Sequence, residues 1–280
     1  MPVLLRDIAE ALLQLLANRE RGALATVVQS SGSTPQKPGS RLLLLPDGTT
    51  IGTVGGGAIE LAVLDALREA VRTGQSQVFA RDLGYDLAMC CGGRMEIFIE
   101  PIEPVPRLVV CGAGHVAKAA APMARTVGFD VTVVDDREEL NTEERFPGCE
   151  RALVEPPEFL RSHALGDCDW LLIATHDHAL DEKTLEHSLA HAPRYVGLVG
   201  SERKVIRIVQ RIVARRGPFA VDHLYAPVGV DLGAASPEEI AVSIVAELVA
   251  LRHGRPANHL RVADDARFAH ALRIAREAAK

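Results

Sequence analysis

The sequence predicts an α/β fold, with a C-terminal Rossmann-like, doubly wound parallel sheet preceded by a smaller α+β domain. First, short apolar runs alternate with helical patterns after about residue 106, which is typical of parallel sheets built from βαβ units. Second, a fingerprint of GxGxxA type, residues 112–117, stands at the first strand-to-helix junction. Third, three prolines between residues 101 and 106 indicate a stiff linker. We therefore expect two domains, residues 1–103 and 104–280.

The bulk properties of the chain fit this organisation and exclude some partners. A length of 280 residues suits two domains of about 100–200 residues each. The net charge of -6 and the isoelectric point near 5.9 argue against nucleic-acid binding, which favours basic surfaces. No apolar run reaches the roughly 20 residues of a membrane helix, and residues 1–6 lack the features of a signal peptide. We expect no nucleic-acid partner, no membrane association and a cytoplasmic location.

The individual elements follow from local patterns. Apolar residues at helical spacing predict a helix over residues 6–17, and Asp47-Gly48 predicts the turn of a hairpin. A capping box with proline at the first helical position begins at Ser236 and starts a helix that ends near Arg252. The other helices are expected at 58–72, after the fingerprint and at 264–278. The strands are expected at 23–29, 41–45, 49–54, 76–82, 95–100, 108–111, 131–134, 152–154, 170–174 and 195–199.

The fingerprint at residues 112–117 predicts a nucleotide-type site. Gly112 permits a tight turn, Gly114 lets the backbone approach a pyrophosphate, and the following helix N-terminus supplies amide donors from His115 onward. Asp135 follows at about the spacing expected of a carboxylate that binds a ribose hydroxyl. That carboxylate disfavours a 2′-phosphate and so favours NAD over NADP, although Arg137 works against this preference. The alternative is that the fingerprint serves helix–strand packing alone.

Two further motifs lie in the N-terminal part. Gly55, Gly56 and Gly57 precede a helix and form either an anion cradle or a plain strand-to-helix turn. Cys90 and Cys91, followed by Gly92 and Gly93, place two thiols beside flexible backbone. Adjacent cysteines are poorly placed to bind one metal together, and no CxxC completes a zinc set. A sulfur-handling or soft-metal role is therefore preferred to structural zinc, the alternative being two small buried residues.

Polar residues also follow the later strands of the C-terminal part. His176 and His178, with Asp181, come after the strand at 170–174, at the edge where open α/β sheets bind ligands. This group is compatible with metal binding, proton transfer, ligand contact or a structural role. Asp231 precedes the capped helix and is either a ligand contact or part of a turn.

Seven motifs in fixed order make the chain resemble a known family. They are GSTPQKPGSR, GTVGGGAIE, MCCGGRMEIFIEP, CGAGHVA, THDHALD, GLVGS and VDLGAASPEEIA, and the resemblance runs from about residue 32 to residue 252. This resembles the XdhC/CoxI family, the accessory factors of xanthine dehydrogenase and related molybdenum hydroxylases.

The resemblance implies a function that the residue patterns alone do not establish. It implies a chaperone-like protein without catalytic residues of its own. Such a protein binds molybdenum cofactor, as molybdopterin or its dinucleotide form, protects it during sulfuration by a cysteine desulfurase, and passes it to an apo molybdenum hydroxylase. It also implies a homodimer.

The family motifs assign the candidate cofactor-binding residues in this chain. These are Ser33, Thr34, Gly55, Gly56, Gly57, Cys90, Cys91, Gly92, Gly93, Gly112, Gly114, His115, His176, His178 and Asp231, to which the ribose-binding expectation adds Asp135. Cys91 is the candidate contact to molybdenum through the cofactor. The doubled cysteine leaves open which of the two thiols matters.

We expect the cofactor to lie in a cleft between the domains, because glycine and thiol motifs flank one proline-rich linker. Its phosphate would lie toward the glycine motifs and its molybdenum toward Cys90 and Cys91. Two alternatives use the Rossmann domain differently. One is an NAD-dependent oxidoreductase with His176 or His178 as proton donor, and the other is a module that senses NAD without turnover.

Overall fold

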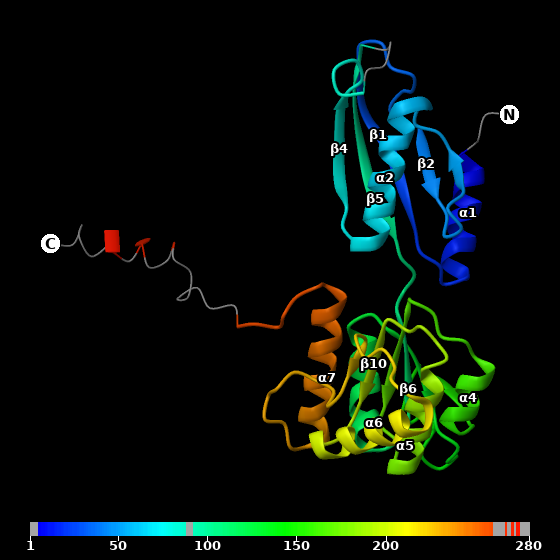
Figure 1. Cartoon of the computed structure of the whole chain (residues 1–280), viewed down its shortest axis with the longest axis vertical. Coiled ribbons are helices and arrows are strands. Elements are labelled where there is room, and N and C mark those ends of the chain that lie inside the picture. The colour runs from blue at the N-terminus through cyan, green and yellow to red at the C-terminus, as the bar shows by residue number, and fades with distance from the viewer. Residues whose placement is uncertain (1–4, 88–91, 260–266, 268–269, 272, 275–280) are drawn as a thin grey trace.

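The structure is a computed structural model that describes residues 5–87, 92–259, 267, 270, 271, 273 and 274. It contains two sheets in two successive domains joined by a short connection (Figure 1). Most of the C-terminal helix expected at 264–278 lies outside the described residues. None of the described helices combines the length and apolar character that a membrane span requires.

The N-terminal domain is an antiparallel sheet with helices on both faces. The sheet has five strands in the order β3-β2-β1-β5-β4. Its elements are α1 (Leu5–Ala17), β1 (Gly22–Ser31), β2 (Arg41–Leu44), β3 (Thr50–Gly52), α2 (Gly57–Thr73), β4 (Gln77–Asp82) and β5 (Arg94–Ile102). Ala23, Ala25 and Val27 alternate along β1 and are buried with the apolar face of α2, as the two-residue period of a strand requires. Leu24 points to the other face and packs with α1.

The linker begins later than the prolines indicate, because Pro101 belongs to β5 and pairs with Ala23 of β1. Proline lacks an amide hydrogen and is tolerated in a strand only where no neighbour needs that donor. β4 pairs with β5 only up to Ile99, so Pro101 has no strand on its other side.

The C-terminal domain is a parallel sheet in the strand order β11-β10-β9-β6-β7-β8. This is the doubly wound order of a Rossmann fold, which confirms the predicted fold class. Its elements are β6 (Arg107–Cys111), α3 (His115–Thr126), β7 (Asp130–Val134), β8 (Glu150–Ala152), α4 (Pro156–Ser162), β9 (Asp169–Ile173), α5 (His178–Ser188), β10 (Tyr195–Leu198), α6 (Glu202–Arg216), β11 (Leu224–Tyr225) and α7 (Pro237–Arg252). The sequence patterns missed β11, whose two residues are too few to show a period.

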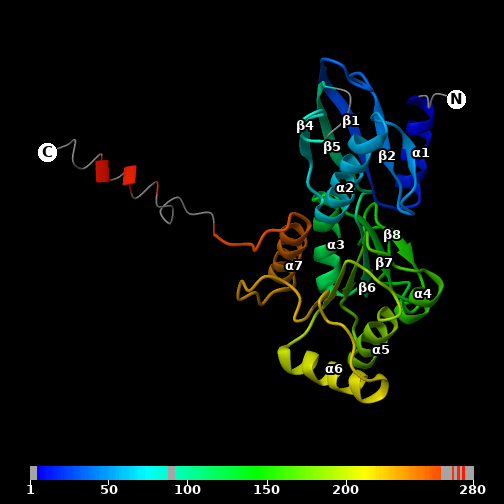
Figure 2. The ribbon, with the colours of Figure 1, turned by 45° about the horizontal axis from the view of Figure 1, so that its top comes forward.

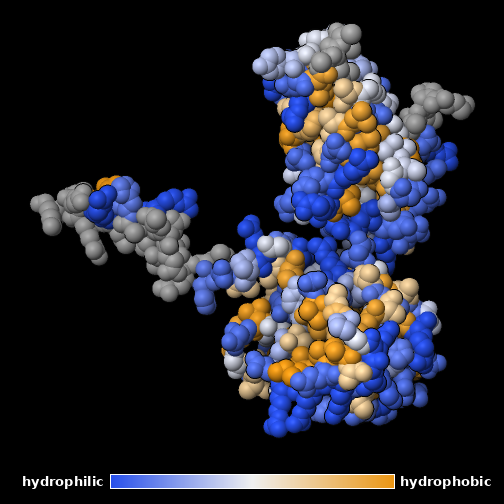
Figure 3. All heavy atoms as spheres, viewed as in Figure 1, coloured by the Kyte–Doolittle hydropathy of each residue, from blue (hydrophilic) through white to orange (hydrophobic). Residues whose placement is uncertain are grey.

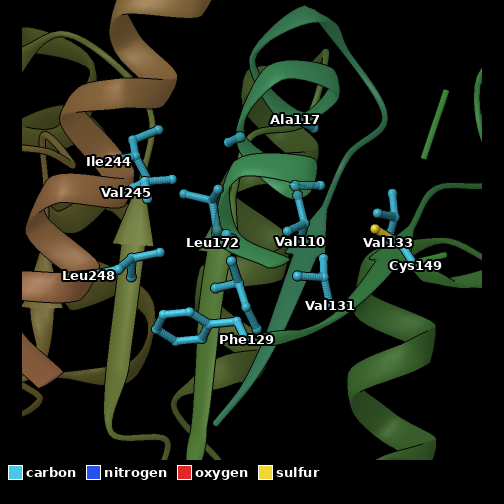
Figure 4. Packing of buried hydrophobic residues seen from close by; sticks show 14 of the residues in the cluster. Val110, Ala117, Phe129, Val131, Val133, Cys149, Leu172, Ile244, Val245 and Leu248 are labelled. Atoms are coloured by element: carbon cyan, nitrogen blue, oxygen red, sulfur yellow. The ribbon is translucent and has the colours of Figure 1, made fainter. Parts of the chain in front are cut away.

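Helices cover both faces of the parallel sheet. On one face α7 presents Ile244, Val245 and Leu248 toward Val110 and Leu172 of the central strands (Figure 4). On the other face, buried residues of α4, α5 and α6 pack against the same strands. Because both faces are covered, every residue of β9 is buried, as expected of a parallel strand.

The amino ends of the parallel strands face the N-terminal domain. Arg19 of that domain bonds to Asp130, the first residue of β7, with 2.8 Å between guanidinium nitrogen and carboxylate oxygen. Arg21 lies 3.7 Å from the carboxylate of Asp167, just before β9. Arg194, just before β10, approaches Glu103 to 3.8 Å. The carboxyl ends of the strands therefore point away from the N-terminal domain, as two views of the ribbon also show (Figures 1 and 2).

Candidate functional site

The glycines of the fingerprint differ in what surrounds them. Gly112 has a φ of 115°, and a Cβ added to it would lie 2.3 Å from the carbonyl oxygen of Ala174. Glycine is therefore required there for backbone conformation and for close packing of neighbouring strand ends. A Cβ added to Gly114 would meet no described atom within 4 Å, and its φ of -72° suits any residue. Gly114 thus borders open space, as expected where a ligand approaches backbone.

That open space is a cavity of about 400 Å³ at the carboxyl ends of the strands. Residues that follow β6, β7, β9 and β10 line it, so it lies where the strand order reverses, the usual ligand position in this fold. Its described polar lining is basic or neutral and consists of His115, Arg137, Arg145, Thr175, His176 and Lys204. We call this cavity the crevice.

The carboxylate expected to bind ribose is already bonded within the chain. Asp135 is 3% exposed and accepts hydrogen bonds from the Ala113 amide at 2.7 Å and from Arg137 Nε at 2.8 Å. Burial raises the pKa of Asp135, but hydrogen bonds from Arg137 and Ala113 outweigh it, so the pKa lies below its ordinary value. Arg137, and not Asp135, lines the crevice. The acidic group holds the glycine turn while the guanidinium faces the ligand space.

A second buried carboxylate is covered in the same way. Asp181 is 1% exposed. Its carboxylate accepts hydrogen bonds from Lys204 Nζ at 2.5 Å and from the hydroxyl of Thr175 at 2.7 Å. Lys204 also donates to the carbonyl of Val199 at 2.8 Å and lines the crevice. In both pairs the basic side chain separates the carboxylate from the ligand space, so an approaching ligand meets positive charge.

Arg145 adds a third cation to the crevice. One of its terminal nitrogens donates to the carbonyl of Ala113 at 2.9 Å, whereas its buried Nε has no hydrogen-bond partner within the described part of the chain. Sequence reasoning missed Arg145 and Lys204. No signal points to Arg145, which lies in an irregular loop, whereas Lys204 sits in the first turn of a capped helix next to the Gly200-Ser201 junction.

The two candidate histidines separate in the structure. His176 is exposed and lines the crevice, whereas His178 is the first residue of α5 and is not among the residues that line it. Asp177 between them caps α5 by accepting the Leu180 amide at 3.1 Å. No group of three or more His, Cys, Asp or Glu residues that could hold a metal occurs among the described residues. The HxH pattern therefore includes the start of a helix, since Asp177 is the N-cap of α5 and His178 is its first residue.

Asp231 lines a second cavity of about 580 Å³ beside the crevice. The two cavities share Val199, which follows β10, so together they extend along the carboxyl edge of the sheet. Asp231 is exposed, and its carboxylate accepts only a long 3.4 Å bond from the Gly233 amide among the contacts described. The structure thus brings Gly114, His115 and His176 to one cavity and Asp231 to its neighbour, whereas Gly112 packs against Ala174.

The N-terminal motifs meet at the end of the sheet farthest from the linker. A Cβ on Gly93 would lie 2.5 Å from the carbonyl of Ser33 and 2.7 Å from the side chain of Thr34. One on Gly55 would lie 2.4 Å from Pro35. Three loops that are distant in sequence therefore pack together; we call this cluster, residues 31–35, 55–57 and 92–93, the tip.

An acidic side chain sits at the tip. Glu60 accepts the Gly56 amide at 3.1 Å and the Thr53 hydroxyl at 2.5 Å. Gly56 and Gly57 border open space and have φ values of 71° and 64°. The Gly56 amide is engaged by a carboxylate, so the tip is a weaker anion cradle than the crevice.

The thiol candidates Cys90 and Cys91 lie outside the described residues, next to Gly92. The three described cysteines are buried and free. Burial raises the pKa of Cys149 and Cys111, and it raises the pKa of Cys168 to about 12. These three thiols are therefore poor nucleophiles.

The structure does not bring the tip and the crevice together in one interdomain cleft. β5 leads from the tip at Arg94 to the linker, and β6 then leads from the linker to the crevice at Gly112 (Figure 1). Eight residue steps in β5 and four in β6, at about 3.3 Å each, together with the extended linker, separate the two sites by on the order of 50 Å.

Relatives of known sequence and structure resemble both domains. The Escherichia coli (strain K12) protein YqeB is 33% identical over 244 residues, which cover 84% of this chain and 44% of YqeB. A Bacillus subtilis (strain 168) protein, described as a probable subunit of xanthine dehydrogenase, is 35% identical over 157 residues, covering 56% of this chain and 46% of that protein. The chain thus spans less than half the length of these curated relatives.

A crystal structure described as a xanthine dehydrogenase from Bacillus halodurans shares the fold, with a TM-score of 0.50 at 23% identity, covering 92% of this chain and 97% of that chain. The family profile "XdhC Rossmann domain" matches residues 108–248, and the profile "XdhC and CoxI family" matches residues 15–82. Together these two matches cover most of both domains. The chain belongs to the XdhC and CoxI family.

Proposed function

We propose that this chain is a maturation factor that binds molybdenum cofactor and delivers it, in sulfurated form, to a molybdenum hydroxylase of the xanthine dehydrogenase type. Family membership and the name of the Bacillus subtilis relative support this role. The partners in the proposal are the apo hydroxylase and a cysteine desulfurase, and the chain acts as a cytoplasmic homodimer.

One structural observation carries the proposal: the crevice suits a phosphate-bearing ligand. Molybdopterin ends in a phosphate, and its dinucleotide form contains a pyrophosphate. Open backbone at Gly114, the N-terminus of α3 and the basic groups of Arg137, Arg145 and Lys204 surround the same space. Helix N-termini and guanidinium groups are the donors that phosphates prefer in proteins.

In this function the crevice binds and orients, and it does not carry out a reaction. The bound cofactor supplies the molybdenum centre on which the hydroxylase depends. Arg137 and Lys204 are held in place by Asp135 and Asp181, so the cations lose little freedom when they bind phosphate. Cys91 remains our candidate contact to molybdenum, next to Gly92 of the tip.

The alternative, an NAD-dependent enzyme or sensor, has weaker support. The strand order and the glycine turn suit NAD as well as a pterin nucleotide. However, the carboxylate that would accept the ribose hydroxyls is occupied by Arg137 and the Ala113 amide. A cation at that position favours an anionic group over an uncharged ribose.

The test is the binding of isolated molybdenum cofactor under anaerobic conditions, measured by pterin fluorescence. The binding of NAD is measured in parallel. Gly114→Ala places a methyl group in the ligand space without a clash among the described atoms, so affinity should fall at least about tenfold. Gly166→Ala is the matched control, because its Cβ also meets no described atom within 4 Å, and it lies before β9 at the opposite edge of the sheet. Unchanged binding by the Gly114 variant, or binding of NAD without the cofactor, would overturn the proposal.

A further inference from the structure

The carboxylate that would bind a ribose in the crevice has no capacity left for one. Oδ1 of Asp135 accepts hydrogen bonds from the backbone amide of Arg137 at 3.0 Å and from Arg137 Nε at 2.8 Å. Oδ2 accepts hydrogen bonds from the Ala113 amide at 2.7 Å and from a terminal nitrogen of Arg137 at 2.6 Å. A carboxylate accepts about four hydrogen bonds, two at each oxygen. Both oxygens of Asp135 are therefore fully used within the chain.

The guanidinium that covers this carboxylate keeps donors for a ligand. Arg137 lines the crevice, and its side chain is 25% exposed. Its Nε and one terminal nitrogen donate to Asp135, so the other terminal nitrogen takes no part in that pair. The pair with Asp135 also fixes the orientation of the guanidinium. A phosphate that binds Arg137 therefore costs the side chain little freedom.

Lys204 is also held in place while it keeps a donor for a ligand. Its ammonium donates to Asp181 and to the carbonyl of Val199, and an ammonium has a third donor. In Figure 3 the surface of the C-terminal domain carries hydrophilic and apolar residues side by side, whereas no Asp or Glu is among the described residues that line the crevice. A ligand in the crevice therefore meets oriented cations with spare donors and no free carboxylate.

We propose that Arg137 forms a subsite for a terminal phosphate, that is, a phosphate monoester, at the position where a Rossmann fold usually binds a ribose. The inference rests on the proposed function for the identity of the ligand. Molybdopterin ends in such a phosphate, whereas in its dinucleotide form a nucleotide, with its ribose, is joined to that phosphate. Arg137 thus determines the specificity of the crevice, which selects molybdopterin over the dinucleotide form.

The charges and hydrogen-bonding groups of the two ligand ends explain this preference. A phosphate monoester carries roughly -1.5 to -2 charges at pH 7 and offers three acceptor oxygens. Hydrogen bonds from a guanidinium to a phosphate are about twice as strong as those between neutral groups, and the hydroxyls of a ribose are neutral. A ribose also has hydroxyl hydrogens that need acceptors, and Asp135 supplies none because both of its oxygens are used. A ribose beside Arg137 is therefore bound more weakly than a phosphate.

The same chemistry reverses the nucleotide preference that the spacing of Asp135 predicts. A free carboxylate at this position favours NAD over NADP, because it repels a 2′-phosphate. With Arg137 paired to Asp135, the subsite favours a 2′-phosphate over an unmodified ribose. Molybdopterin and NADP are thus two sources of one kind of group, a phosphate monoester. A binding experiment that includes both ligands distinguishes the two sources.

The first experiment compares ligands on the wild-type chain. Molybdopterin and its dinucleotide form are titrated under anaerobic conditions by pterin fluorescence, and NADP and NAD are then added as competitors. Molybdopterin should bind at least about tenfold more tightly than the dinucleotide form. Displacement by NADP at concentrations at least about tenfold lower than NAD would identify NADP as a second ligand of the subsite, and no displacement by either would leave molybdopterin as its ligand. Equal or tighter binding of the dinucleotide form, or equal displacement by NAD and NADP, would overturn the inference.

The second experiment repeats these titrations with variants of the chain. Arg137→Gln removes the cation, so the preference for molybdopterin over the dinucleotide form should fall to about twofold or less. Arg137→Lys keeps a cation without the planar fork and should show an intermediate preference, which also decides the matter if the glutamine variant does not fold. Arg211→Gln is the matched control, because Arg211 is an exposed arginine of α6 that does not line the crevice and whose partner Glu182 keeps Arg215. A wild-type preference in the folded Arg137 variants would overturn the inference.

The subsite and the proposed function fail in different ways. Tighter binding of the dinucleotide form than of molybdopterin would leave the proposed function standing and remove the subsite. Binding of NADP in preference to NAD, without binding of molybdopterin in either form, would remove the proposed function and leave the subsite. If none of these ligands binds to wild type, both are removed.

Discussion

The crevice and the tip are both glycine-rich, and in each region two nearby glycines have different roles. In the crevice, Gly112 supports the packing of strand ends and Gly114 borders open space, so structure and ligand access are divided between two neighbours. At the tip the same division occurs between Gly93, which is buried against the loop at Ser33, and Gly92, which borders open space. A glycine motif therefore marks both a backbone requirement and an open surface, and only the packing around each glycine distinguishes the two roles.

The two regions also differ in charge. Carboxylates near the crevice are covered by basic side chains, whereas Glu60 at the tip accepts hydrogen bonds from the Gly56 amide and the Thr53 hydroxyl and pairs with no cation among the described contacts. The crevice is therefore suited to anions and the tip is not.

Breaking the ion pair behind the crevice should have the largest effect. Lys204→Met leaves Asp181, which is 1% exposed, as a buried charge without its cation, and this should cost about 3–5 kcal/mol of unfolding free energy. Denaturant unfolding measures it. The double variant Lys204→Met with Asp181→Asn should recover most of the loss, since neither charge is then left alone. Equal instability of the single and double variants would mean that the pair is not the cause.

Alanine at Gly112 should destabilise the C-terminal domain by about 2–3 kcal/mol, because its φ is 115° and its Cβ would clash with the Ala174 carbonyl. Gly114→Ala should change stability by less than about 0.5 kcal/mol. Thermal unfolding compares the two. Similar losses at both positions would contradict the division of roles in the crevice.

At the tip, Gly93→Ala should lower the unfolding free energy by about 1–2 kcal/mol, a smaller loss than at Gly112. Gly93→Ala pushes against the carbonyls of Ser31 and Ser33, whereas Gly92→Ala meets no described atom. The surrounding loops are exposed and can yield in part, which is why the loss is smaller than at Gly112. Hydrogen exchange of β1 and β5 amides would locate the effect in the N-terminal domain, and destabilisation by the Gly92 variant alone would refute it.

The smallest effect concerns pH. The pKa of Asp135 in the folded chain lies below its ordinary value of 3.8, so its ionisation adds stability above about pH 4 that is lost as the pH falls toward the folded pKa. Arg137→Ala removes the main hydrogen-bonding partner. The stability difference between pH 6 and pH 3 should therefore be smaller in the variant than in wild type. Arg151→Ala, which removes a more exposed pair with Glu143, is the control, and an equal change in both would argue against this role for Arg137.

Much of the fold could be predicted from local patterns. The alternating strands and helices after residue 106 and the GxGxxA turn identify the parallel sheet, and the capping box at Ser236 is present with both of its hydrogen bonds. Pro101 was misassigned to the linker, because the sequence does not show that β4 ends before reaching it. The expected cleft between the domains was wrong, since β5 and β6 continue away from each other through the linker.

The candidate site was only partly predictable. The spacing of Asp135 from the fingerprint predicts that it contacts a ligand. The spacing does not reveal that the Arg137 guanidinium donates hydrogen bonds to the Asp135 carboxylate and so occupies it. Arg145 and Lys204 reach the crevice from a loop and a helix that are 32 and 90 residues from Ala113 and Gly114. The hydrogen bond from the Tyr195 hydroxyl to Glu247, 2.7 Å long, likewise joins residues that are 52 positions apart in the sequence.

By itself the sequence determined the element types, the family and the loops that carry the chemistry, because periodicity, turn residues and motif order are local properties. The tertiary structure alone decided which groups share a space and which charge faces it. Side chains from distant elements meet only after the sheet forms. A buried carboxylate is then stable only when a cation pairs with it, because an unpaired buried charge is strongly destabilising. The direction of the linker, which leaves the tip and the crevice at opposite ends, was likewise decided by packing of Arg19 and Arg21 against the strand starts.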